Sequence, residues 1–169
     1  MFQISGSISI IVYLLIFLNT CLLPVFAMLV LKRMGLISSL HIDIQTERSL
    51  PYFITFCFYL STWWLIYKAP LPEFIANLLL GAAIAILLAG IINYKIKISS
   101  HLIGVGGAVG AFLAVNLYST VDFSFFFIVS ILLAGLMGWA RLELRAHQPI
   151  EVYSGFLLGV FSQLAAFIL

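Results

Sequence analysis

Six long apolar segments separated by short polar breaks constrain this chain more than any other feature. A helix needs about 20 largely apolar residues to cross a bilayer. The 169 residues are 64% hydrophobic and 8% charged, whereas a soluble domain has about 25% charged residues. The segments cover approximately Ile8–Leu31, Leu50–Tyr67, Pro72–Ile92, Leu102–Leu117, Phe123–Ala140 and Ile150–Leu169. The sequence therefore predicts an all-α integral membrane protein, a single six-transmembrane-helix bundle of residues 1–169.

Composition and charge exclude several classes of function. The net charge is +2 and there is no basic run, so we expect no nucleic-acid partner. Cys21 and Cys57 lie in apolar segments without metal-site spacing, and we expect them to pack or face lipid. The spans hold almost no ionisable residues, which disfavours a transporter. The first apolar stretch lacks a charged flank and a cleavage site, so we expect a membrane helix rather than a signal peptide.

Proline and glycine predict local features of two spans. Pro24 lies inside the first span, where its missing N–H predicts a kink that neighbouring helices accommodate. The fourth span has a face of small residues, which predicts close helix packing within the chain or between copies. This face consists of Gly104, Gly106, Gly107 and Gly110.

Alternate connections of a six-span protein lie on the same membrane face, so loops 32–49, 93–101 and 141–149 share one side. All three histidines fall on that side, and the opposite face keeps only Lys68 among the basic residues. The basic residues and histidines of the shared face are Lys32, Arg33, His41, Arg48, Lys95, Lys97, His101, Arg141, Arg145 and His147. This asymmetry predicts a site at one membrane surface.

Two histidines on this face suit acid–base and nucleophilic chemistry. His147 precedes the sixth span and Glu151 follows four residues later, on the same helical face. A carboxylate so placed holds one imidazole nitrogen and leaves the other free as a nucleophile or base. His101, in the second of these loops at the start of a span, is then available to protonate a leaving group.

The same loops carry groups that bind anions. Arg48 and Arg141 offer forked, permanently charged donors suited to phosphate oxygens. Ser99 or Ser100 is a plausible N-cap of the fourth span, whose first N–H groups favour an anion. Lys97 adds a further cation nearby. The interpretation is a phosphate-handling site.

The three clusters resemble the signature of the type 2 phosphatidic acid phosphatases, K-x6-R-P, P-S-G-H and S-R-x5-H-x3-D. Arg141 and His147 have the spacing of the third motif, with Glu151 in the place of the aspartate. Residues Ile98–His101 keep the serine and the histidine of the second motif, and resemble a divergent bacterial branch with Lys-Ile-Ser-x-His. The first motif is weakest, because His41 replaces the lysine and the proline comes at Pro51 instead of directly after Arg48.

The resemblance implies an integral membrane enzyme, in a bacterial inner membrane, that hydrolyses a lipid phosphate or pyrophosphate without a metal or other cofactor. His147 would form a phosphohistidine, Glu151 would orient it and His101 would protonate the leaving group. The phosphoryl oxygens would be bound by Arg48, Arg141, Lys97 and the backbone of Ser99 and Ser100. The resemblance covers about residues 40–160, and it implies a site on the outer side of the membrane.

Some interpretations remain open. Apart from motif residues, Lys32, Arg33, Lys95 and Arg145 stand against Lys68, and this bias would place the motif face in the cytoplasm. The altered motifs also suit a non-catalytic lipid-headgroup binder or a subunit of a membrane assembly. A zinc site of the histidines with Glu151 lacks supporting spacing. The sequence selects neither a particular lipid nor an oligomeric state.

Overall fold

The computed structural model describes residues 6–40, 42, 44–120 and 122–169. Within these residues the chain is helical and has no strand. Six helical stretches are long and apolar enough to cross a membrane, which confirms the predicted fold class. His41 was named as an altered motif position, and it lies outside the described residues.

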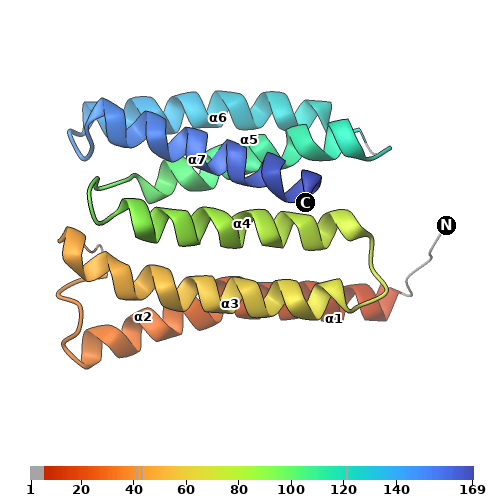
Figure 1. Cartoon of the computed structure of the whole chain (residues 1–169), viewed down its shortest axis with the longest axis horizontal. Coiled ribbons are helices and arrows are strands. Elements are labelled where there is room, and N and C mark those ends of the chain that lie inside the picture. The colour runs from red at the N-terminus through yellow and green to blue at the C-terminus, as the bar shows by residue number, and fades with distance from the viewer. Residues whose placement is uncertain (1–5, 41, 43, 121) are drawn as a thin grey trace.

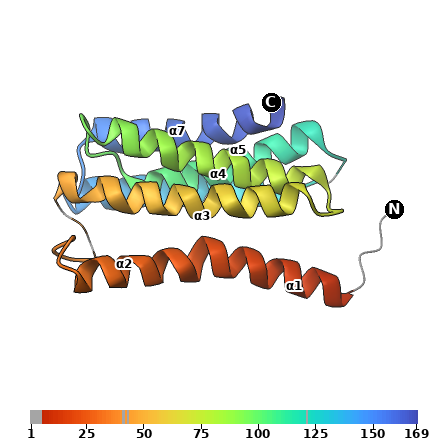
Figure 2. The same ribbon diagram turned by 60° about the horizontal axis from the view of Figure 1, so that its bottom comes forward.

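The first span has three pieces, α1 (Gly6–Phe17), the π-helical turn η1 (Leu18–Leu22) and α2 (Leu23–Arg33). Pro24 is the second residue of α2 and has no N–H to offer to the preceding turn. The wider turn η1 comes directly before it, as expected where the helical ladder is interrupted. Figure 2 shows the change of direction between α1 and α2. The kink expected at Pro24 thus takes the form of a π-helical turn.

The other spans begin and end within a few residues of their predicted limits. The short 3₁₀ helix η2 (Gln45–Arg48) leads into α3 (Ser49–Tyr67), and α4 (Glu73–Ile92), α5 (Ser100–Tyr118), α6 (Ser124–Glu143) and α7 (Pro149–Ile168) follow. Pro51 and Pro149 lie in the first turns of α3 and α7, where an N–H has no helical acceptor. Their positions therefore help to define where these helices begin.

The arrangement of the helices places three connections together. Figure 1 shows the connections α2–α3, α4–α5 and α6–α7 at one end of the bundle. Helix α7 packs extensively against α5 and α4, while α3 packs on α4 and α6 on α5. The first span lies to one side, against α3 (Figure 2). The loops that carry the candidate site residues thus meet at one face.

Glycines bring α5 and α7 into backbone contact. A Cβ atom at Gly106 would collide with the carbonyl of Phe156, and one at Gly110 would lie 2.6 Å from the carbonyl oxygen of Val160. A Cβ atom at Gly159 on α7 would collide in the same way with the carbonyl oxygen of Ile103. A Cβ at Gly104 or Gly107 would meet no described atom within 4 Å. The packing face predicted for this helix therefore holds Gly106 and Gly110, together with the backbone of Gly107, whose nitrogen would lie 2.5 Å from a Cβ atom at Gly159.

Candidate functional site

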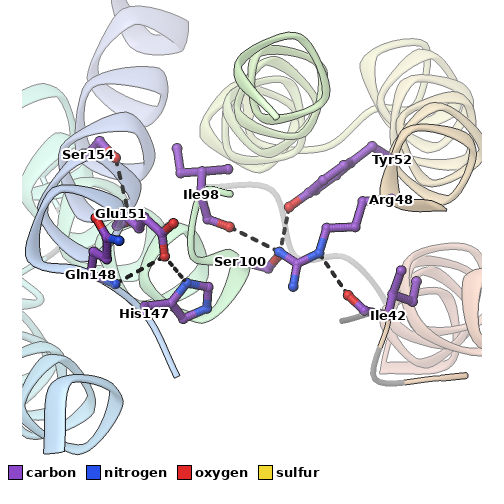
Figure 3. A network of polar contacts seen from close by, with 9 residues as sticks. All are labelled: Ile42, Arg48, Tyr52, Ile98, Ser100, His147, Gln148, Glu151 and Ser154. Atoms are coloured by element: carbon purple, nitrogen blue, oxygen red, sulfur yellow. Dashed lines mark hydrogen bonds and ion pairs between the residues drawn. The ribbon is translucent and has the colours of Figure 1, made fainter. Parts of the chain in front are cut away.

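His147 and Glu151 form the best-defined part of the site. The Nδ1 atom of His147 lies 2.8 Å from Oε2 of Glu151 (Figure 3), and the side chains are 7% and 15% exposed. The same carboxylate oxygen accepts the N–H of Gln148 at 3.1 Å. Because the start of α7 fixes Glu151, the imidazole is held through Nδ1 and Nε2 is left for chemistry. This pairing is the one that the i, i+4 spacing predicts.

Arg141 lies in the last turn of α6, across the connection from His147. Its side chain is half-buried. Among the described residues it forms no hydrogen bond or ion pair, although it interacts electrostatically with His101. The guanidinium donors therefore remain available to an anion.

His101 is the second residue of α5 and is exposed. Arg141, His147 and Arg48 all lie within electrostatic range of its imidazole. Arg48 comes from the α2–α3 connection, whereas Arg141 and His147 both come from the end of α6 and its connection to α7. The structure thus brings the three sequence clusters together around His101.

Ser99 and Ser100 occupy different environments. Ser99 is at the N-cap of α5 but is 0% exposed, and its hydroxyl makes no hydrogen bond to the described residues. Its N–H donates to the carbonyl oxygen of Glu151 at 3.2 Å. The prediction that Ser99 or Ser100 is the N-cap is confirmed by the position of Ser99, but its hydroxyl makes no capping hydrogen bond and its backbone N–H is already used. Ser100 is exposed at the mouth of the site.

The hydroxyl of Ser100 lies 2.7 Å from the hydroxyl of Tyr52 on α3 (Figure 3). The sequence interpretation did not include Tyr52. Its position one helical turn after Arg48, on the same face of the chain, was the available signal. The pair connects α3 to the start of α5 beside His101.

Arg48 is oriented mainly by the backbone. Its Nε donates to the carbonyl oxygen of Ile42 at 2.9 Å, and Nη1 donates to that of Ile98 at 3.4 Å (Figure 3). The guanidinium thereby joins the loop before α3 to the connection between α4 and α5. Two donors are consumed by these bonds, so Arg48 has less capacity for phosphate than Arg141.

A second polar link lies beside Arg48. The side-chain amide of Asn93 donates to the carbonyl oxygen of Gln45 at 2.8 Å, and the Gln45 amide donates to the carbonyl oxygen of Asn93. Asn93 is 1% exposed. These reciprocal bonds fix the α4–α5 connection against η2. The sequence interpretation missed both residues, because amides carry no signature of their own.

The remaining candidate, Lys97, makes fewer polar contacts. Lys97 is half-buried and forms no hydrogen bond or ion pair with the described residues. No group of three or more histidine, cysteine, aspartate or glutamate side chains among the described residues could hold a metal ion. The site is therefore made of imidazoles, guanidiniums, hydroxyls and one carboxylate.

Comparison of the chain with protein-family models, curated proteins and solved structures found no match in any of the three. The functional argument therefore depends on the residues and geometry of the site. Those residues combine a carboxylate-held imidazole, a second imidazole and an unengaged guanidinium at the end of a membrane-embedded bundle.

Proposed function

We propose that this integral membrane protein is a lipid phosphate phosphatase that acts through a phosphohistidine intermediate. The observation that carries the proposal is the 2.8 Å contact between His147 Nδ1 and Glu151 Oε2. It orients the ring and favours the tautomer whose Nε2 lone pair is free to attack. Arg141 and His147 both lie within electrostatic range of His101, so that Arg141 can supply charge and His101 a proton donor. The resemblance to the type 2 phosphatidic acid phosphatases assigns the same roles.

The reaction follows from these positions. Nε2 of His147 attacks phosphorus, the bond from phosphorus to the lipid oxygen breaks, and protonated His101 donates its proton to that oxygen. His101 then accepts a proton from water as the water oxygen attacks the phosphohistidine. The phosphorus–nitrogen bond breaks, its electron pair returns to Nε2, and inorganic phosphate leaves. Glu151 stabilises the positive charge that the His147 ring carries during attack.

Charge at the phosphoryl oxygens would be balanced by fixed cations. Arg141 is the principal candidate because its guanidinium is unengaged, and Lys97 and the first N–H groups of α5 lie on the same face. Such preorganised donors stabilise charge that develops in a transition state. A substrate phosphate at headgroup level would leave its hydrocarbon chains in the bilayer.

The test is phosphate release by the purified protein. In detergent micelles containing phosphatidic acid and EDTA, the wild type should release phosphate and His147→Ala should release none above background. Arg145→Ala is the matched control, because Arg145 lies in the same connection and is exposed. Equal rates for wild type and His147→Ala would refute the proposal.

A non-catalytic headgroup binder is the second candidate. It is favoured because the backbone bonds of Arg48 occupy a guanidinium to which the resemblance assigns a role in the phosphatase reaction. A binder needs the anion site but no free imidazole. It would hold phosphatidic acid with similar affinity in the wild type and in His147→Ala, and neither protein would release phosphate. Loss of binding in Arg141→Ala would still be expected.

A further inference from the structure

A partly open cavity leads away from the candidate site into the membrane-spanning part of the bundle. Its volume is about 420 Å³, and it lies among α3, α4, α5 and α7. Ser100 and Tyr52, whose hydroxyls are hydrogen-bonded beside His101, line the end of the cavity nearest the candidate site. The cavity is thus continuous with the candidate site.

The walls of the cavity are apolar and made largely of small residues. Alanines from α4 and α5 face each other across it, and α4 and α5 contact each other little along their lengths. Wall residues on α5 extend from Ser100 to Ala111, which corresponds to about 16 Å of helix. This length is about half of a hydrocarbon core of about 30 Å, so the cavity matches one leaflet.

Two glycines in the wall leave their side-chain positions open to the cavity. Gly104 and Gly107 both line it, and a Cβ at either would meet no described atom within 4 Å. The side-chain positions of their neighbours Gly106 and Gly110 face α7, where Gly107 takes part through its backbone alone. Glycine in a helix interior lowers stability relative to alanine, so these two residues keep space open at a cost.

Gln163 on α7 lies at the deep end of the cavity. It is 6% exposed, its amide nitrogen donates to the carbonyl oxygen of Leu78 at 3.2 Å, and its Oε1 has no hydrogen-bond partner among the described residues. A buried, unpartnered acceptor in a membrane span is costly. Gln163 therefore adds a polar side chain to the wall of the cavity.

We infer that this cavity holds one hydrocarbon chain of the lipid whose phosphate occupies the candidate site. Gly104 and Gly107 set the width of the space that this chain occupies. The inference depends on the proposed function for the identity of the headgroup. A volume of about 420 Å³ is near the lower end of the range of about 300–1,000 Å³ for ligand pockets, which suits one chain and not two. The second chain of a two-chain lipid would remain in the bilayer.

The experiment uses the full-length protein in phosphatidylcholine vesicles and a phosphatidic acid with a photoreactive diazirine in the middle of one palmitoyl chain. After illumination, we expect the label on peptides of α4 and α5 that contain the residues lining the cavity. Labelling there should fall at least fivefold in Gly104→Leu/Gly107→Leu. It should be unchanged in Gly135→Leu, which adds the same side chain to an exposed position on α6 where a Cβ meets no described atom within 4 Å.

Ala82→Leu fills the cavity from α4 and provides a second variant if the α5 variant does not fold. Equal wall labelling in wild type and both filled variants would overturn the inference, as would labelling confined to the outer faces of α6 or the first span. Equal wall labelling by phosphatidylcholine carrying the same chain would also overturn it, because the cavity would then be a general lipid site.

Labelling requires no turnover, so the two proposals fail separately. A wild type that is labelled in the cavity but releases no phosphate would refute the phosphatase and leave the chain site. Phosphate release at equal rates from palmitoyl phosphatidic acid by wild type and filled variants, without wall labelling, would refute the chain site and leave the phosphatase.

Discussion

The two arginines of the site lie in different settings. Arg48 donates to two backbone carbonyls and joins the loop before α3 to the connection before α5. Arg141, at the end of α6, forms no such bond among the described residues and lies within electrostatic range of His101, as His147 does. One guanidinium holds the scaffold together, and the other is available to a ligand. Under the proposed function, the α6–α7 side of the site would be the reactive side, and the η2 side would support it.

Arg141→Ala should have the largest effect. Removing a preorganised donor to developing charge typically costs about 10²- to 10³-fold in rate, and we expect this loss in kcat/KM for phosphatidic acid. The thermal unfolding midpoint should stay close to that of the wild type, because the guanidinium has no partner in the described part of the protein. Kinetics and a thermal melt in the same detergent measure both. A loss below about threefold would remove Arg141 from the reactive side.

Glu151→Gln should reduce kcat by about 10- to 100-fold, the usual cost of losing a group that orients a catalytic side chain. The amide retains an acceptor for the N–H of Gln148 but cannot stabilise a charged imidazole. Glu47→Gln is the matched control, since the Glu47 carboxylate accepts the N–H and hydroxyl of Ser38 on the η2 side. Similar kcat values for both variants would contradict the contrast between the two regions.

Gly155→Ala tests the connection between α7 and the start of α5. The added Cβ would lie 2.8 Å from the carbonyl oxygen of Ser99, so the start of α7 must shift relative to His101. We expect a roughly threefold to tenfold loss of kcat with destabilisation of about 1–3 kcal/mol, as for overpacked cores. Gly135→Ala is the control with open space around it. Wild-type kcat in Gly155→Ala would show that this contact does not position the site.

Arg48→Gln should have the smallest effect on kcat, within about threefold, and should act mainly on stability. It removes two hydrogen bonds from a charged donor, each worth about 1.5–3 kcal/mol at most. A lowered thermal midpoint with nearly normal kinetics is the expected result. A loss of kcat/KM as large as that of Arg141→Ala would make Arg48 a phosphate ligand after all, as the sequence resemblance implies.

The sequence predicted the parts of this architecture that depend on local spacing. Six apolar segments define the spans, and their alternation brings the connections carrying Arg141, His101 and Arg48 to one face. The His147–Glu151 contact follows from its i, i+4 spacing at the start of a helix. The His147–Glu151 contact depends on residues close in sequence, and the shared face of the connections depends on the number of spans between them.

Contacts between helices could not be read from the sequence in the same way. Ser99 occupies the N-cap position of α5, but whether its hydroxyl also caps the helix depends on how closely α7 approaches. Likewise, Gly104 and Gly107 look the same in sequence as Gly106 and Gly110, and only the direction each faces separates cavity wall from packing contact. The backbone bonds of Arg48 depend on two carbonyls placed by tertiary packing.

Trapping the covalent intermediate tests the role of His147 most directly. The protein would be mixed with ³²P-labelled phosphatidic acid, quenched in base to preserve phosphohistidine, and digested for mass spectrometry. We expect label on His147 alone and on its Nε2 atom, because Nδ1 is held by Glu151. Label on another residue, or rapid phosphate release with no labelled histidine at any time point, would contradict the mechanism.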